Sequence, residues 1–147
     1  GIFIWKVDNW SLVTKIKEPL GELVGSTAWH YRLNWSPDGQ LLAGTVAYDK
    51  PSHQSILIER GKWTSEFNYC GHRGPVCVAR FNPHLFFPRK HPDSDEVVSI
   101  CALGSGDKQF TVWSRAEVLP IMAGKGFFKQ GVMDVAWSPD GYSLLVC

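Results

Sequence analysis

The sequence has almost no net charge and no long apolar run. The formal net charge is +1 over 147 residues, so no global electrostatic field favours nucleic acid or an anionic membrane as a partner. No apolar stretch approaches the ~20 residues that a membrane-spanning helix needs, and no secretory leader is visible. We therefore expect neither membrane insertion nor direct sequence-specific binding of nucleic acid.

Motifs of known catalytic sites are also missing. The sequence holds no Gly-x-Ser-x-Gly, no phosphate-binding Gly-x-x-x-x-Gly-Lys and no His-Glu-x-x-His. Gly104, Ser105 and Gly106 resemble the start of a phosphate loop, but they precede an expected strand where such a loop needs a helix. The sequence thus predicts a protein that is not an enzyme and that holds no cofactor.

Cysteines are few and do not form a metal motif. The spacing of Cys70, His72 and Cys77 matches no standard zinc site. Cys77 and Cys101 fall on alternating apolar positions, where a free thiol behaves as a small hydrophobic side chain. We expect no bound metal, and free thiols in a reducing, intracellular compartment.

What the chain does carry is an internal repeat. Trp-Ser-Pro-Asp-Gly occurs at 35–39 and again at 137–141, with a diverged Phe-Asn-Pro at 81–83 between them. A second marker, a short apolar segment, ends at the evenly spaced positions Trp5, Glu59 and Trp113. Two interleaved markers with matching periods are typical of the long repeats that form propeller blades.

Apolar residues alternate with others ahead of Trp35, Phe81 and Trp137, which is typical of strands with one buried face. Pro-Asp-Gly then supplies a tight turn. Further strands are expected at 41–46 and 97–103, and outer strands at 65–69 and 117–122. The pattern predicts an all-β propeller segment built from four-stranded antiparallel blades.

These strands divide the chain into parts of four blades. We place the end of one blade at 1–18, a second blade at 29–69, a third at 76–123 and the start of a fourth at 131–147. Because the chain starts and stops inside expected strands, we expect it to be a piece of a longer protein. About half of the propeller would then lie outside it.

Two segments resemble the markers of the WD-repeat family more specifically. Gly71-His72 is similar to the Gly-His that opens such a repeat, and 104–113 to the turn and strand that close it with Asp107 and Trp113. In that family His, Asp and Trp join a Ser or Thr in a hydrogen-bonded tetrad. The position expected to carry the hydroxyl is Leu103 here, so His72, Asp107 and Trp113 are expected to form a triad at best.

The neighbouring repeat departs further from the WD pattern. It has Gly25-Ser26 in place of Gly-His and Glu59 in place of Trp. Two insertions also lengthen connections between strands, at 48–54 and at 82–96. Because loops on a rigid scaffold often carry function, we name partner-contact candidates on the second insertion and on the turn after Glu59. They are Arg60, Lys62, Trp63, Phe86, Phe87, Arg89 and Lys90.

The aromatic members of this set could also have purely structural roles. Phe86 and Phe87 could instead pack down and close the edge of the blade. Trp63 could simply begin an outer strand.

Beyond the generic repeat, nearly the whole chain resembles one family. The segments 5–12, 33–39, 58–63, 71–83, 132–137 and 144–147 are similar to the later blades of the HIRA (Hir-family) histone chaperone subunit. The Ile-Glu-Arg strand end at 58–60, which follows a long loop, is the most specific part. The 82–96 insertion departs from that family in composition.

This resemblance implies a seven-bladed nuclear propeller in a larger chain. It implies a non-catalytic scaffold for replication-independent nucleosome assembly and transcriptional repression, with a ubinuclein-type subunit and other complex subunits as partners and histones bound indirectly. Two other hypotheses stay open. One is a WD-repeat scaffold in another pathway, such as substrate recognition for a ubiquitin ligase. The other is a propeller enzyme, for which a channel lined by His, Asp or Glu would be expected.

Overall fold

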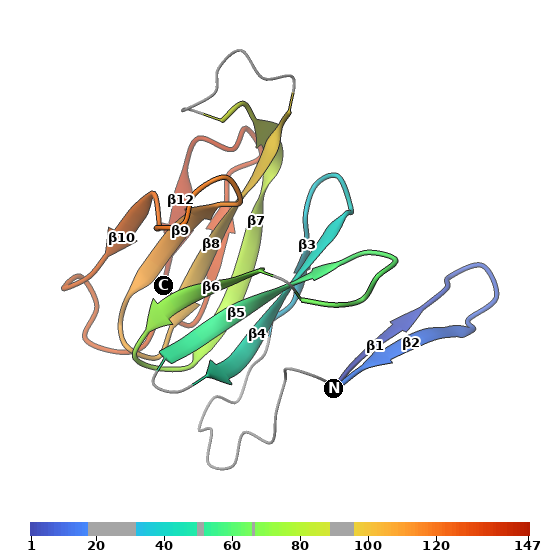
Figure 1. The fold of residues 1–147 in the computed structure, drawn as a ribbon. Coiled ribbons are helices and arrows are strands. Elements are labelled where there is room, and N and C mark those ends of the chain that lie inside the picture. Colours follow the sequence, from blue (N-terminus) through green and yellow to red (C-terminus); the bar gives the residue numbers. More distant parts are fainter. Residues whose placement is uncertain (18–31, 50–51, 66, 89–95) are drawn as a thin grey trace.

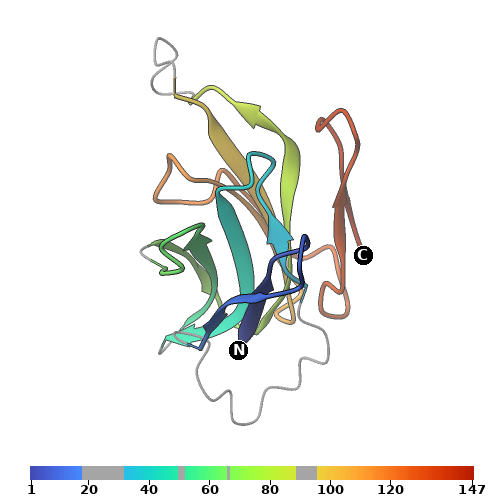
Figure 2. The same cartoon turned by 90° about the vertical axis from the view of Figure 1, so that its right-hand side faces the viewer.

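The computed structural model describes residues 1–17, 32–49, 52–65, 67–88 and 96–147. Every regular element in this part of the chain is a β-strand, and the strands form four separate antiparallel sheets (Figures 1 and 2). None of these residues belongs to a helix that could cross a membrane. The all-β prediction is confirmed.

The two end sheets have two strands and the two middle sheets have four. The first sheet pairs β1 (Ile2–Trp5) with β2 (Leu12–Ile16). The second sheet contains β3 (Asn34–Trp35), β4 (Leu41–Asp49), β5 (Ser52–Glu59) and β6 (Phe67–His72) in that order. The third contains β7 (Val76–Phe86), β8 (Val98–Ser105), β9 (Phe110–Ser114) and β10 (Met122–Gly124). The fourth pairs β11 (Val135–Trp137) with β12 (Leu144–Val146).

Each pair of neighbouring sheets encloses its own apolar cluster. Ile2 and Ile16 of the first sheet pack with Ile56 and Ile58 of the second. Two larger clusters fill the next two interfaces: Leu57, Tyr69, Leu103 and Trp113 belong to the one between the second and third sheets, and Val78, Val112, Val132 and Val135 to the one between the third and fourth. The sheets therefore stack face to face, as the blades of a propeller do.

Backbone hydrogen bonds also join the second and third sheets near their first strands. Arg32 forms an isolated parallel bridge with Val78 just ahead of β3. Its N–H donates to the carbonyl of Cys77 at 3.2 Å, and its own carbonyl accepts from the N–H of Ala79. The first strands of adjacent sheets thus run side by side, with β7 lying next to β3 and β4 in Figure 1.

The two insertions are not loops over their whole length, which corrects the prediction. Residues 48–49 and 52–54 extend β4 and β5 as a hairpin, in which Tyr48 pairs with His53 and Asp49 with Ser52. Residues 82–86 likewise extend β7, and Phe86 pairs with Val98 of β8. Extended pairing satisfies the backbone N–H and C=O groups that an irregular loop would leave to solvent.

The outer strands of the two middle sheets lie further along the chain than predicted. β6 begins at Phe67 and runs to His72, whereas the prediction ended it at 69. β10 begins at Met122 because residues 114–117 form a turn, closed by the N–H of Glu117 donating to the carbonyl of Ser114. Val118 and Leu119 after that turn are 85% and 74% exposed, so their apolar character did not mark a strand.

Candidate functional site

His72 joins the second sheet to the third through a buried polar network. It is the last residue of β6 and is 2% exposed. Its Nδ1 lies 3.1 Å from Oδ2 of Asp107, and its Nε2 lies 2.9 Å from Oγ1 of Thr111. Nε1 of Trp113 donates to the same hydroxyl oxygen at 2.7 Å. The ionised carboxylate of Asp107 can only accept, so Nδ1–H of His72 donates to it, and in the neutral imidazole Nε2 then accepts the hydroxyl proton of Thr111.

The network is therefore a tetrad, and the expectation of a triad was wrong. Leu103, the position assigned to the missing hydroxyl, is fully buried in the apolar cluster between the second and third sheets. Thr111 lies directly opposite Leu103 on the neighbouring strand β9 and supplies the hydroxyl instead. The signal was present in the sequence, since residues two apart on a strand share one face, as Thr111 and Trp113 do.

A Thr–His–Asp arrangement could suggest a nucleophile and its base, but burial argues against that reading. Thr111 is 8% and Trp113 is 4% exposed. The hydroxyl of Thr111 already contacts both His72 and Trp113. A substrate carbonyl could not approach it without opening the interface between the sheets, so the geometry fits a fastening role and does not fit acyl transfer.

The carboxylate of Asp107 is held ionised by its donors. Burial raises the pKa of this group, but hydrogen bonds from His72, the Arg73 N–H and the Ser105 hydroxyl outweigh that effect and lower it to about 2. The Arg73 N–H donates at 2.9 Å and the Gln109 N–H at 3.2 Å. Asp107 thus fixes the connection between β6 and β7 to the turn between β8 and β9.

Tyr69 connects the tetrad to the apolar cluster between the second and third sheets. Its ring stacks on the ring of Trp113, with centroids 5.0 Å apart and planes 25° apart. Tyr69 is fully buried, and its hydroxyl has no hydrogen-bond partner among the described residues. Burial is the main reason that the pKa of this hydroxyl lies far above its ordinary value. Tyr69 therefore contributes mainly through ring packing.

The turn with Arg60, Lys62 and Trp63 is largely engaged within the protein. The guanidinium of Arg60 lies 5.2 Å from the ring of Trp35 and donates to the carbonyl of Gly39. Lys62 forms an ion pair with Glu59 at 3.1 Å. Trp63 packs edge-on against Trp35, with centroids 6.3 Å apart.

Trp63 also packs against the cluster between the first and second sheets. It does not begin an outer strand: it lies in a turn, with φ of 58°, and its N–H donates to the carbonyl of Glu59.

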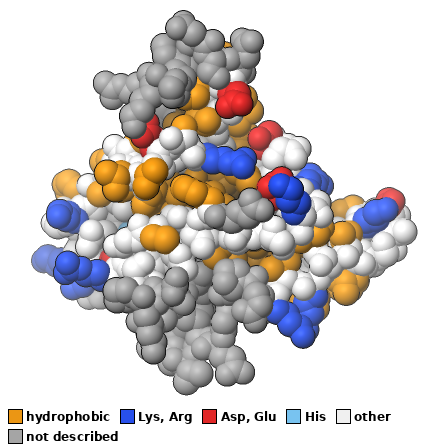
Figure 3. Space-filling view, in the orientation of Figure 1, with side chains coloured by type: hydrophobic (Ala, Val, Ile, Leu, Met, Phe, Trp, Pro, Cys, Tyr) orange, Lys and Arg blue, Asp and Glu red, His pale blue; other side chains and the backbone are white. Residues whose placement is uncertain are grey.

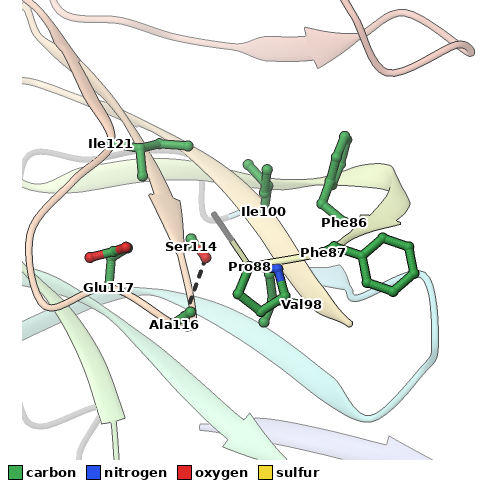
Figure 4. A pocket seen from close by; sticks show the side chains of 9 residues that line it. All are labelled: Phe86, Phe87, Pro88, Val98, Ile100, Ser114, Ala116, Glu117 and Ile121. Atoms are coloured by element: carbon green, nitrogen blue, oxygen red, sulfur yellow. Dashed lines mark hydrogen bonds between the residues drawn. The ribbon is translucent and has the colours of Figure 1, made fainter. Parts of the chain in front are cut away.

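The hairpin between β7 and β8 presents its two phenylalanines differently. Phe86 is half-buried, whereas Phe87 is 66% exposed. Both line a groove of about 770 Å³ (Figure 4). The groove is lined by Phe86, Phe87, Pro88, Val98, Ile100, Ser114, Ala116, Glu117 and Ile121. The remaining contact candidates, Arg89 and Lys90, lie outside the described residues.

Two interactions that the sequence analysis missed fix the fourth sheet to β7. The Asn82 side chain donates to the carbonyl of Gly141 at 2.8 Å. The His84 ring contacts the carbonyl of Pro139 at 2.9 Å. A Cβ at residue 141 would lie 2.5 Å from Oδ1 of Asn82, so the glycine of Pro-Asp-Gly is needed for this close approach as well as for its φ of 75°.

Metal chemistry finds no support in the side chains that the structure describes. Among them, no three His, Cys, Asp or Glu residues lie close enough to share a metal ion. Cys77, Cys101 and Cys147 are free thiols.

Four stacked antiparallel sheets, joined at one interface by a His–Asp–Thr–Trp tetrad, define the class: the chain is a segment of a WD-repeat propeller. Comparison with known proteins agrees. The chain is 40% identical to the Hir1 protein of Schizosaccharomyces pombe over 99% of its length. It is 35% identical to the HIRA protein of rice over 95% of its length, and 34% identical to that of Xenopus laevis over 95%.

The chain belongs to the HIRA and Hir1 family as a WD-repeat segment, and the resemblance drawn from the sequence is confirmed. It spans 15% of the length of the fission-yeast protein and 16% of the rice protein. No protein-family model matches the chain. A chain of the mitotic checkpoint complex is similar in structure, with a TM-score of 0.44 and 14% identity over 98% of this chain and 52% of that one. The fold assignment rests on the four sheets and not on that likeness.

Proposed function

We propose that this segment is part of a non-catalytic interaction scaffold in a nuclear histone chaperone complex. The complex acts in replication-independent nucleosome assembly and in transcriptional repression. The observation that carries the proposal is the match to HIRA and Hir1 proteins of plants, fungi and vertebrates over nearly the whole segment.

The physical character of the segment supports a scaffold. Its polar network at His72 is buried between two sheets and holds them together. Its cysteine thiol at Cys101 is buried, and burial raises the pKa of that thiol well above its ordinary value, so it is a poor nucleophile. Rigid stacked sheets with exposed turns suit the holding of other proteins.

The proposed partners are a ubinuclein-type subunit and the other subunits of the complex, with histones held through them. The proposed contact face combines the turn of Arg60, Lys62 and Trp63 with the hairpin that carries Phe86, Phe87, Arg89 and Lys90. Of the described members, the side chain of Lys62 is 60% exposed and Phe87 is 66% exposed, so both are accessible to a partner. Trp63 would act mainly by holding the turn against Trp35.

The proposal is tested by capture of a purified ubinuclein-type subunit on the intact protein. We expect the unsubstituted protein to bind the subunit, and Phe87→Ser or Arg60→Glu to weaken that binding. Met133→Ser is the matched control, because Met133 is 52% exposed and lies just ahead of β11, at the end of the sheets opposite the proposed face. Undiminished binding by Arg60→Glu, Phe87→Ser and a variant with a shortened 84–94 hairpin would rule out this face. Failure of the unsubstituted protein to bind would count against the chaperone assignment.

A further inference from the structure

Three connections between strands meet at one end of the third sheet. Gly106 N–H donates to the carbonyl of Pro75 at 2.9 Å, which joins the β8–β9 turn to the β6–β7 connection. Val132 N–H donates to the carbonyl of Ser105 at 2.9 Å, which joins that turn to the β10–β11 connection. The antiparallel strand order puts this end opposite the turn of Arg60 and Trp63.

Four cations lie on these connections, and we call them the basic edge: Arg73, Lys108, Lys125 and Lys129. All four side chains are exposed. One carboxylate, that of Asp107, is found in residues 70–75, 104–109 and 123–132. It already accepts hydrogen bonds from His72 and from the N–H groups of Arg73 and Gln109. No ion pair is found for the four cations within the described part of the chain. In Figure 3, Lys and Arg side chains gather at the lower left, where these connections lie in Figure 1.

An exposed aromatic ring stands among these charges on a well-fixed loop. Phe127 lies between Lys125 and Lys129 and is 74% exposed. The next residue, Phe128, packs edge-on against Phe110 in the apolar cluster between the third and fourth sheets, with centroids 6.4 Å apart. Gly124 lies so close to the Phe110 ring that a Cβ there would collide with it. The loop is therefore anchored from both sides while Phe127 points away from the core.

We propose that the basic edge binds an acidic protein segment that carries an apolar side chain, with Phe127 as the apolar contact. Charge complementarity selects the acidic segment, because four unpaired cations attract carboxylates and repel other cations. When the segment binds, the exposed ring becomes buried against its apolar side chain and adds a contact that charge pairs alone do not supply.

Other ligands fit this surface less well. Single-stranded nucleic acid is held by several aromatic rings on which successive bases stack, and the basic edge offers one exposed ring. Non-specific duplex binding rests on a wide positive field, whereas the whole chain carries a net charge of +1. Basic histone tails would be repelled. The inference goes beyond the proposed function, because it concerns the opposite end of the sheets and a ligand of opposite charge to histones.

The test measures binding to the intact protein by fluorescence anisotropy. The probe is a short labelled peptide of alternating glutamate and glycine with one central phenylalanine. We expect salt-sensitive binding that Lys125→Glu/Lys129→Glu weakens at least about tenfold, since both attractions become repulsions. Phe127→Ala should weaken it about three- to tenfold by removing the apolar contact. All three side chains are exposed, so the variants should keep the native circular dichroism.

The matched control is Lys6→Glu, an exposed cation in the β1–β2 turn, which should leave the affinity nearly unchanged. Equal loss in this variant would mean attraction to charge anywhere on the protein and would overturn the site. Absence of peptide binding by the unsubstituted protein would overturn it as well. Tighter binding of a single-stranded oligothymidine, lost in the Lys125 and Lys129 variant, would replace the acidic segment by nucleic acid. Capture of the ubinuclein-type subunit is a separate readout, so failure of either proposal is recognised on its own.

Discussion

The second and third sheets are each fastened to the sheet before them, but by different chemistry. In the third sheet, Thr111 of β9 is hydrogen-bonded to His72 of the preceding sheet, and Trp113 of β9 stacks on Tyr69 of that sheet. In the second sheet, Ile56 and Ile58 of β5 meet Ile2 and Ile16 of the preceding sheet through apolar contacts. The third strand of a blade can therefore be held to the preceding sheet by polar contacts or by apolar ones.

The difference shows why aligning markers by sequence misleads. Equal spacing matched Glu59 with Trp113, yet Ile58 is the residue that faces the preceding sheet as Trp113 does. Side chains alternate between the two faces of a strand, so an offset of one residue between the repeats assigns a position to the wrong face. Glu59 is therefore left half-buried beside Lys62, and it does not replace the tryptophan.

The largest effect is expected from breaking the apolar fastening. Ile58→Ala removes a fully buried side chain from between two sheets, and the resulting cavity should lower the free energy of unfolding by about 2–4 kcal/mol. Urea unfolding of the intact protein, followed by tryptophan fluorescence, measures the loss. Val7→Ala is the matched control, because Val7 is 75% exposed and should cost little. Equal losses in the two variants would contradict the packing described for β5.

A smaller loss is expected from the polar fastening. Thr111→Val keeps the shape of the side chain but leaves Nε2 of His72 and Nε1 of Trp113 without their shared partner. The cost should be about 1–3 kcal/mol in the same unfolding measurement. Thr111→Ser retains the hydroxyl and should recover much of the stability. If Thr111→Val were as stable as the unsubstituted protein, the tetrad would not fasten the sheets.

The polar fastening should also respond to acid, which the apolar one should not. The folded pKa of Asp107 is about 2, below the ordinary value near ~3.9. Its contribution is therefore present above about pH 4 and is lost as the pH falls toward 2. Between pH 4 and pH 2, the unsubstituted protein should lose roughly 2 kcal/mol more unfolding free energy than Asp107→Asn does. An unchanged acid dependence in this variant would show that the carboxylate is not held ionised by the tetrad.

The smallest effect is expected where a fastening contact is exposed. Arg60→Ala removes a cation from above the Trp35 ring and one hydrogen bond to Gly39. Such contacts at exposed sites contribute about 0.5–1 kcal/mol. Lys62→Ala, which breaks a surface ion pair, serves as the comparison and should cost even less. A loss in Arg60→Ala as large as that in Ile58→Ala would mean that the turn, and not the apolar cluster, holds the first two sheets together.

Sequence reasoning reached the features that repeat along the chain. The repeated Pro-Asp-Gly turns and the alternation ahead of Trp35 predicted antiparallel sheets, and the Gly-His and Asp–Trp markers named three of the four tetrad residues. Thr111 was missed because the fourth group was sought at Leu103, on the wrong strand of the pair. The two faces of a sheet and the register between its strands depend on bulges, such as the one at His53 and Gln54, which leave no clear mark in the sequence.

Contacts between segments that are far apart in the sequence could not be predicted from it. Asn82 meets Gly141 across two sheets, and Arg73, Lys108 and Lys125 gather from three separate connections. Locally, each of these residues belongs to a turn or to a repeat marker, and that local pattern does not show which residues meet. The extension of β7 through Phe86 was also missed, because Pro83 and His84 suggested a loop.

The most direct test of the account is histone deposition by the intact protein with its co-purified subunits on a plasmid that is not replicating. We expect the purified complex to supercoil the plasmid by assembling nucleosomes, and depletion of this protein to abolish the activity. Undiminished deposition after depletion, together with recovery of ubiquitin-ligase subunits as its stoichiometric partners, would contradict the assignment to a histone chaperone scaffold.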